Sequence, residues 1–418
     1  MLKFGYDQFN DDTWEVIKPN GLIGQKEIPE TFRLYLPPWF GDIFSNHSVL
    51  FQVNSSKTLI KENNKDRWIY LIEPNGDPRG WFGLFRDENP NPIKSLLAGV
   101  DEETLKSCRE DKAIICLWQP NEGFPSEWIG INIFEEIFKE LKHKKLSPKN
   151  FLYVCGNWKT KIEYKRWKEQ LTEDFVDQDD IHLCAFNNER YLDFKKKWKG
   201  ELSKFNSTLK RKKHFVCFNR ELRPHRKLFL TMMLEANLMD FGYVSSKKFD
   251  IETFFRVPKE LGVGKGVAKK LKGYAEKLVD MTPLVVDVDE WDTNHFSIIT
   301  TTWFAEDTVF FDEKIWKPMA NEHPFLVVGN YMVLEELRRQ GFKTFHPHID
   351  ESYDLEHHPY RRMKMIIKEV ERLSKFTLDE MNEWYKKLQP ILEHNNKHLY
   401  SLDSLNELTA KFNDITKG

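Results

Sequence analysis

The sequence lacks the closely spaced cysteine pairs that mark a zinc site or a disulfide framework. It has five cysteines, and none lies within four residues of another, which excludes a CxxC-type metal site. An odd number of widely spaced cysteines predicts reduced, mostly buried thiols, as in a cytoplasmic protein. The five are Cys108, Cys116, Cys155, Cys184 and Cys217.

Long apolar runs and a strong net charge are also missing. Runs such as FLVV at 325–328 are far too short to cross a bilayer, so we expect no membrane span. The first residues, MLKFGYDQFNDD, are acidic and mixed, which predicts no signal peptide. The formal net charge is −2, so the molecule as a whole is no polycation. Binding to nucleic acid would therefore require a local basic patch.

What the chain does have is length and apolar content. Its 418 residues allow two or three domains. Hydrophobic residues make up 40% of the chain and aromatic residues 14%, which excludes a disordered polar chain. We found no internal repeat and no low-complexity stretch.

Residues 1–195 alternate between apolar strands and an amphipathic helix. Phe134, Ile137, Phe138 and Leu141 follow the i, i+3, i+4, i+7 spacing of a helix. Continuous apolar strands separated by such helices predict a parallel sheet that is covered on both faces. The expected strands are WIYLIEP (68–74), AIICLW (113–118) and FLYVCG (151–156).

A basic segment at 195–213 separates this half from a second alternating unit. It holds nine lysines and arginines against one acid, Glu201, and is either a solvated linker or a patch for an anionic acceptor or for donor phosphates. We expect helices at 224–237, 331–340 and about 363–373 beyond it. The expected strands are HFVCF (214–218), LVVDV (284–288), SIITTTWF (297–304), VFF (309–311), FLVVG (325–329) and FKTF (342–345).

The C-terminal segment, 377–418, reads as helical. Thr377 and Glu380 form a Thr-x-x-Glu capping box, and an apolar stripe from Met381 to Leu392 predicts core packing. The sequence therefore predicts an α/β protein in three parts. These are an N-terminal domain (1–200), a C-terminal domain (201–376) and closing helices (377–418).

Two polar clusters follow predicted strands in the second unit. The first, Asn219 to Arg226, comes directly after a buried strand and opens a helix, where backbone N–H groups and arginines suit a pyrophosphate. The second comprises Glu306 and the segment Asp312–Pro318, which follows VFF. Asp312 alone could be an N-cap, but Glu313 and Lys314 together suggest a carboxylate for ribose and a cation for phosphate.

These segments, FVCFNRELRPHR, FFDEKIWKPMANEHPF and GFKTFHPHIDESYD, together resemble glycosyltransferases of the GT-B architecture. They are most similar to the fucosyltransferase-like glycosyltransferases of phage and viral genomes. The resemblance covers about 214–375, apart from 249–280. Over 1–195 the similarity is weaker and only general. It implies two Rossmann-like parallel-sheet domains that face each other across a cleft and are closed by C-terminal helices. It also implies a cytoplasmic protein, in the host cytoplasm if viral.

The resemblance implies a UDP- or GDP-sugar donor and no required metal. Arg220 and Arg226 would contact the diphosphate, Glu313 the ribose, and Lys314 or Lys317 the phosphate charge. Asp312 stands where many relatives carry Thr. The whole candidate donor set is Asn219, Arg220, Arg223, Arg226, Glu306, Glu313, Lys314 and Lys317.

An inverting transferase also needs a general base for the acceptor hydroxyl, expected on the N-terminal domain. The candidates are Glu73, Glu122 and Asp42, each of which could equally be an ordinary loop carboxylate. Two acceptors remain open. One is a glycan hydroxyl, and the other is a hydroxymethylated pyrimidine in viral DNA. For DNA, basic residues at 142–149 and 159–168 and aromatic residues among them (Trp158, Tyr164, Trp167 and Trp198) could contact phosphates and bases.

Three other hypotheses compete. Asp287 and Asp289 form a DxD, which binds a metal in GT-A transferases. His346, His348 and Asp350 could also hold a metal, although exposed histidines are the default. The chain could instead be a non-catalytic protein that binds a nucleotide sugar or a glycan. The string GVGKG at 262–266 lacks the spacing of a phosphate-binding loop.

Overall fold

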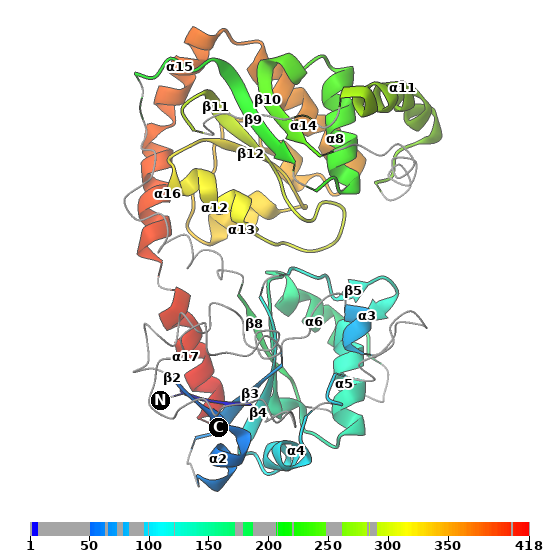
Figure 1. The fold of residues 1–418 in the computed structure, drawn as a ribbon, viewed down its shortest axis with the longest axis vertical. Helices are drawn as coiled ribbons and strands as arrows, with labels where there is room; N and C mark the ends of the chain where they lie inside the picture. Colours follow the sequence, from blue (N-terminus) through cyan, green and yellow to red (C-terminus); the bar gives the residue numbers. More distant parts are fainter. Residues whose placement is uncertain are drawn as a thin grey trace. The chain divides into compact units, whose positions relative to one another are not determined.

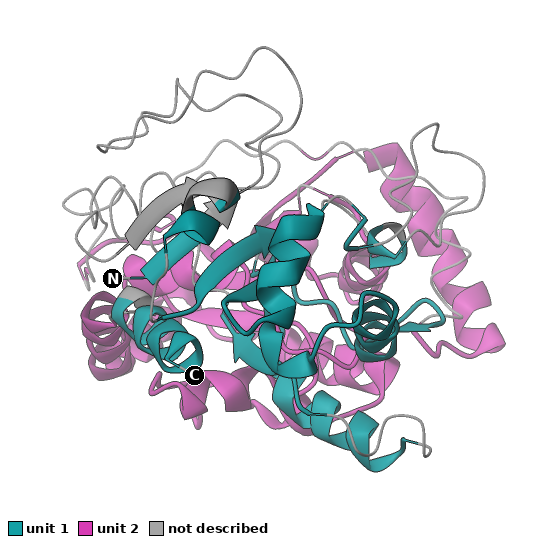
Figure 2. Ribbon diagram, turned by 90° about the horizontal axis from the view of Figure 1, so that it is seen from below, with its two compact units in different colours: residues 1–189, 403–418 teal, residues 190–402 magenta. Residues whose placement is uncertain are grey.

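The computed structural model describes residues 2–6, 51–62, 66–72, 78–82, 96–98, 100–120, 122–171, 179–186, 206, 208–219, 221–247, 261–281, 284, 291–402 and 404–417. The chain divides into two compact units (Figure 2). One holds 1–189 and 403–418, and the other holds 190–402. The C-terminal segment expected from 377 is therefore shared between the two units.

The first unit is built on a six-stranded parallel sheet in the order β2-β1-β3-β4-β7-β8 (Figure 1). β3, β4 and β7 are buried along their whole length, as the continuous apolar runs predict. The strands are β1 (Leu2–Tyr6), β2 (Phe51–Ser55), β3 (Trp68–Ile72), β4 (Ala113–Gln119), β7 (Phe151–Cys155) and β8 (His182–Ala185), beside a small antiparallel pair, β5 (Glu127–Trp128) and β6 (Ile131–Asn132).

Helices cover this sheet. The predicted amphipathic helix is α5, and its apolar stripe is buried. Phe412 of the last helix packs against Phe4 of β1 and Trp118 of β4, with ring centroids 6.1 and 6.2 Å away, and so attaches that helix to the first unit. The helices are α2 (Ser56–Lys61), α3 (Pro78–Trp81), α4 (Glu102–Arg109), α5 (Ile133–His143), α6 (Thr160–Glu169) and α17 (Ser404–Thr416).

The second unit is built on a four-stranded parallel sheet in the order β10-β9-β11-β12. Figure 1 shows α8 and α14 on one side of this sheet and α12 and α16 on the other. The strands are β9 (Lys213–Asn219), β10 (Gly242–Ser246), β11 (Asn294–Thr300) and β12 (Phe325–Val328). The helices are α8 (Pro224–Glu235), α11 (Lys265–Met281), α12 (Glu313–Ala320), α13 (Val333–Arg339), α14 (Pro359–Ser374), α15 (Leu378–Lys387) and α16 (Gln389–Ser401).

Both sheets share one winding pattern. Numbered by appearance within its own sheet, the order is 2-1-3-4 in the second unit and 2-1-3-4-5-6 in the first. In such doubly wound sheets the order reverses between strands 1 and 3, and ligands bind beyond the carboxyl ends of the strands at that point. The reversal lies between β9 and β11 in the second unit, and between β1 and β3 in the first.

Two expected strands, VFF and FKTF, are wrong. Both segments are irregular. VFF is buried throughout, whereas in FKTF only Phe342 and Phe345 are buried. The Asn395 side chain bonds the backbone N and O of Lys343 at 2.8 Å each, and the Glu351 carboxylate accepts the N–H of Phe345 at 2.6 Å. Side chains therefore satisfy the backbone groups that a neighbouring strand would otherwise pair.

Other expectations hold with changed limits. SIITTTWF ends its strand at Thr300, and only Leu284 of LVVDV is described, where it bridges Ser246. The capping box of Thr377 and Glu380 is present. The stripe that follows is split between α15 and α16, since Pro390 begins a new helix.

All five cysteines are buried and unpaired. No helix in the described ranges is long and apolar enough to cross a bilayer.

Candidate functional site

The candidate site lies at the carboxyl edge of the four-stranded sheet, where the strand order reverses. Asn219 ends β9 and Thr300 ends β11, and the Thr300 hydroxyl donates to the Asn219 side-chain oxygen over 2.9 Å. The Asn219 amide also reaches the Ser245 carbonyl of β10 at 3.4 Å. Asn219 is 1% exposed, so this expected donor contact joins three strand ends at the sheet edge.

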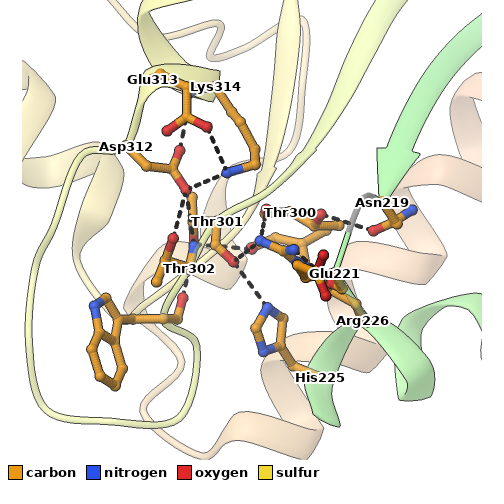
Figure 3. A network of polar contacts seen from close by, with 12 residues as sticks. Asn219, Glu221, His225, Arg226, Thr300, Thr301, Thr302, Asp312, Glu313 and Lys314 are labelled. Atoms are coloured by element: carbon orange, nitrogen blue, oxygen red, sulfur yellow. Dashed lines mark hydrogen bonds and ion pairs between the residues drawn. The ribbon is translucent and has the colours of Figure 1, made fainter. Parts of the chain in front are cut away.

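Arg226 differs from the expectation of a side chain that faces phosphate. It is buried in the first turn of α8, and its guanidinium points at the end of β11 (Figure 3). Its NH1 group donates to the Glu221 carbonyl at 2.7 Å, and its NH2 group donates to the carbonyls of Thr300 and Thr301 at 3.0 and 3.1 Å. In the structure Arg226 therefore holds the strand end in place.

His225 beside it acts in the same way. Its Nε2–H donates to the Thr301 carbonyl at 3.0 Å, and its ring stacks on Phe304 with centroids 5.4 Å apart. Burial lowers the pKa of His225 to about 3, and the positive charge of Arg226 acts in the same direction. The imidazole is therefore neutral and serves as a fixed donor to the backbone.

Arg223 is the described arginine of this cluster that faces outward. It is exposed at the N-cap position of α8, and its guanidinium carbon lies 5.8 Å from the Trp303 ring centroid. A flat cation beside an indole ring can bind a phosphate and stack at the same time. Arg220 lies outside the described residues.

Asp312 is the N-cap of α12, as its simpler interpretation predicted. It is 2% exposed. One carboxylate oxygen accepts the N–H of Lys314 at 3.2 Å, and the other accepts the N–H of Thr302 at 2.9 Å. Asp312 therefore joins the start of α12 to the segment that follows β11, and it fills a structural position there.

Glu313 and Lys314 stand at the open side of this cap. Their side chains are each 26% exposed, and the Lys314 ammonium lies 2.9 Å from Asp312 and 3.4 Å from Glu313 (Figure 3). Lys317 follows three residues later and is half-buried. Glu313 and Lys314 thus lie at the start of α12, where the helix dipole also favours negative charge, while Lys317 belongs to its last turn.

Glu306 turns back onto its own loop. Its carboxylate accepts the N–H groups of Phe304 and Ala305 at 3.1 and 3.0 Å. The Asn330 amide, from the turn after β12, donates to the Glu306 carbonyl at 2.9 Å. Glu306 is therefore placed to shape the loop between β11 and α12 rather than to project from it.

Arg362 is a site residue that the sequence analysis missed. It comes from α14, is 1% exposed, and lies 4.5 Å from the Phe304 ring centroid. Its side chain donates to the carbonyls of Gly329 (3.1 Å), Glu356 (2.7 Å), His357 (3.1 Å) and Phe304. One guanidinium thus holds three loops. Only its burial distinguishes it from other arginines, and sequence does not show that.

The turn after β12 is tightly packed against the end of β11. A Cβ at Gly329 would lie 2.9 Å from a Val327 methyl group and 3.1 Å from the Thr301 hydroxyl. Asn330 is 1% exposed, and its side-chain oxygen has no hydrogen-bond partner within the described part of the chain. This corner of the site therefore has no room for a larger side chain at Gly329.

In the first unit, Glu122 is the described general-base candidate. It is half-buried in the loop after β4, and its carbonyl accepts the N–H of Gly156, just beyond β7, at 3.1 Å. This places Glu122 at the carboxyl edge of the six-stranded sheet. Glu73 and Asp42 lie outside the described residues.

The basic residues expected to form a patch are partly dispersed. Residues 142–149 run from the last turn of α5 to the end of the sheet where β7 begins, and Lys149 there pairs with Asp111 at 3.1 Å. Trp167 and Tyr164 are buried against Phe134 and Phe138, so they are core residues rather than stacking platforms. In the basic linker, 195–205 and 207 lie outside the described residues, as does Trp198.

Arg211, from the end of that linker, is buried rather than solvated. It is 4% exposed, and its guanidinium carbon lies 3.9 Å from the Tyr385 ring centroid. Of the described linker cations, Lys210 and Lys212 are exposed. The positive segment therefore contributes at least one cation to the core of the second unit.

The two metal hypotheses concern His346, His348 and Asp350, and Asp287 and Asp289. Within the described ranges, no group of three or more His, Cys, Asp or Glu residues is placed to hold a metal ion. Asp287 and Asp289 lie outside those ranges. His346 and Asp350 instead line an open cavity of about 680 Å³, with Arg338, Lys343 and Leu355. No candidate donor residue lines that cavity.

Comparison of the chain with models of known protein families, with curated proteins and with solved structures gave no match. A function is therefore inferred from the geometry of the site and from the resemblance of the three sequence segments to glycosyltransferases.

Proposed function

We propose that the protein is a glycosyltransferase that moves a sugar from a nucleoside diphosphate sugar to an acceptor hydroxyl. The observation that carries this proposal is the polar cluster at the reversal point of the four-stranded sheet. There, Asn219 joins the end of β9 to Thr300 of β11. Arg223 is the N-cap residue of α8, which follows β9, and Glu313, Lys314 and Lys317 belong to α12, whose N-cap Asp312 bonds Thr302 just beyond β11. Doubly wound sheets bind nucleotides at this point.

The residues have distinct roles in this proposal. Arg223, Lys314 and Lys317 face the diphosphate and stabilise the negative charge that develops on the leaving group. Glu313 accepts hydrogen bonds from the ribose hydroxyls. Arg226, His225 and Glu306 keep the strand end and its loop in shape, so their contribution to the donor is indirect.

We further propose the GT-B arrangement, in which the acceptor and the general base come from the other sheet domain. Glu122 and Glu73 are the preferred bases, because each follows a strand of the six-stranded parallel sheet at its carboxyl end. Asp42 remains a third candidate. The acceptor is a hydroxymethylated pyrimidine in DNA or a glycan.

The test is a thermal-shift and calorimetric titration with UDP-, GDP- and other nucleotide sugars, with and without EDTA. We expect one nucleotide to raise the melting temperature, by RT ln(1 + [L]/Kd) in free energy, and EDTA to leave the shift unchanged. Glu313→Gln should weaken binding about tenfold or more, since a charged hydrogen bond contributes about 1.5–3 kcal/mol. Glu383→Gln, an exposed glutamate of α15, is the matched control.

The other outcomes separate the alternatives. A shift that disappears with EDTA would support the metal-dependent transferase that uses Asp287 and Asp289. Binding without transfer to any acceptor would support a non-catalytic binding protein. Wild-type affinity in Glu313→Gln would show that the donor site has been misplaced.

A further inference from the structure

Helix α11 is an outlying helix of the second unit. It lies between β10 and β11 in the sequence and packs along α8 on the side away from the sheet (Figure 1). Only Leu271, Ala275 and Leu278 of its 17 residues are buried. This apolar stripe faces α8. Val267, Ala268, Tyr274 and Val279 are half-buried, and the remaining positions of the helix are exposed.

The open surface is rich in lysine. Its lysines are all exposed, against two exposed acids, Glu276 and Asp280. Lys270 pairs with Glu235 of α8 at 2.5 Å and Lys272 with Glu276 at 3.5 Å. Within the described part of the chain, Lys265 and Lys269 form no ion pair. The lysines are Lys265, Lys269, Lys270, Lys272 and Lys277.

The charge order along α11 opposes its own helix dipole. In α4, α5, α13 and α15 the first turn carries acids and the last turn carries bases. In α11 the first turn has no acid and the last turn no base. Lysines occupy its first two turns, and Glu276 and Asp280 lie towards its end. Each terminal charge of the wrong sign costs about 0.3–1 kcal/mol.

Two glycines on the same surface are also unfavourable for the helix. A Cβ at Gly266 or Gly273 would meet no atom within 4 Å, so packing does not require glycine there. A glycine within a helix costs about 1 kcal/mol relative to alanine. Residues that destabilise a helix and are not required by packing are expected at positions where function requires them. Glycines among lysines leave room for a partner to approach the helix closely.

We propose that this lysine face of α11 binds the phosphate backbone of duplex nucleic acid. Lys265, Lys269 and Lys272 lie on one side of the helix at i, i+4 and i+7, and Glu276, the partner of Lys272, follows on the same side at i+11. At a rise of 1.5 Å per residue they span about 10 Å, which covers successive phosphates of one strand. This inference deepens the proposed function. It rests on that function in one respect, that the bound nucleic acid is the acceptor of the sugar.

An anionic membrane is the less suitable partner. A helix that lies in a membrane interface buries an apolar face in the lipid, and the apolar stripe of α11 is already covered by α8. Met281, which is 43% exposed, lies at the last position of the helix. The exposed face thus offers charge and glycine, which suit a phosphate backbone.

The test measures binding of the full chain to a fluorescent duplex of random sequence by anisotropy, without donor, from low to moderate salt. The variant is K265Q/K269Q/K272Q. The matched control, K386Q/K387Q/K397Q, removes three exposed lysines from α15 and α16 of the same unit.

Each lost phosphate contact should reduce the slope of log K against log salt by about 0.9. We therefore expect the α11 variant to lose about 2.7 in slope and tenfold or more in affinity, while the control loses little.

A second variant distinguishes a binding surface from a merely solvated one. Gly273→Gln adds a neutral side chain in open space, so it should raise the melting temperature but weaken duplex binding. Equal losses in the α11 and control variants, salt-independent binding, or unchanged binding in both α11 variants would overturn the proposal. So would lysine-dependent binding to phosphatidylserine vesicles without binding to duplex. Since no donor is present, failure of this test is separate from failure of the donor site.

Discussion

The buried histidines make a sharp prediction about acid stability, and His225 offers the clearest case. Its pKa in the folded protein is about 3, because it is buried and lies near Arg226. An unfolded histidine titrates near 6.5. As the pH falls below 6.5, the unfolded chain binds a proton that the folded chain does not, so the stability that is present above pH 6.5 is lost.

The size of the effect follows from the two pKa values. At pH 5 an unfolded histidine is almost fully protonated and His225 almost fully neutral, which lowers the free energy of unfolding by about 2 kcal/mol. His225→Gln keeps an N–H that can donate to the Thr301 carbonyl but cannot titrate. We expect the variant to lose about 2 kcal/mol less than the wild type between pH 7.5 and pH 5.

The assay should report on the second unit by itself. Hydrogen exchange of the α8 amides, followed by mass spectrometry and corrected for intrinsic rates, gives the opening free energy of that helix. His295, whose pKa burial lowers to about 4, and the buried carboxyls of Glu351 and Asp354, whose pKa values burial raises, also change stability with pH. These groups are the same in wild type and variant, so their effects cancel. If both proteins lose the same free energy, His225 is not the depressed histidine.

Two further predictions concern positioning and core residues. Arg362→Lys should lower the free energy of unfolding by about 2 kcal/mol, because a lysine cannot reach all the loop carbonyls that Arg362 binds and leaves some of them unpaired. The variant should also bind the nucleotide more weakly. Urea unfolding would measure the stability, and calorimetry would measure the binding. Trp167→Ala should cost about 3–5 kcal/mol of stability but leave duplex affinity unchanged, and a loss of affinity in a folded variant would contradict its assignment to the core.

The strands of both sheets could be predicted because parallel sheets bury both faces of a strand. WIYLI, AIICLW and FLVV read as uninterrupted apolar runs, and all three are strands. The same criterion is wrong for VFF, which is equally apolar and buried. Apolar content predicts burial reliably. It does not predict pairing. In FKTF, for example, the Asn395 side chain, and not a neighbouring strand, bonds the backbone of Lys343.

The candidate site could be located from the sequence, but the direction of its side chains could not. Asn219, Arg226 and Asp312 stand out in the sequence because they end or follow predicted strands. The structure shows that each of them binds backbone or neighbouring side chains within the fold. For Arg226 the deciding carbonyls belong to Thr300 and Thr301, more than 70 residues further along the chain. No local pattern encodes that distance.

The inward arginines also change which side chains of the cluster are available to the proposed donor. The NH1 and NH2 groups of Arg226 donate to backbone carbonyls, so this guanidinium is part of the frame, and Arg362 is held in the same way by the carbonyls of Gly329 and Phe304. The groups left for the proposed donor, Arg223, Glu313, Lys314 and Lys317, are therefore fewer than the sequence suggested, and they lie at the N-cap of α8 and on α12. A charge-stabilising site needs its donors fixed before the reaction begins. A frame of buried arginines and histidine that orders a few exposed charges meets that requirement better than a loop of mobile ones.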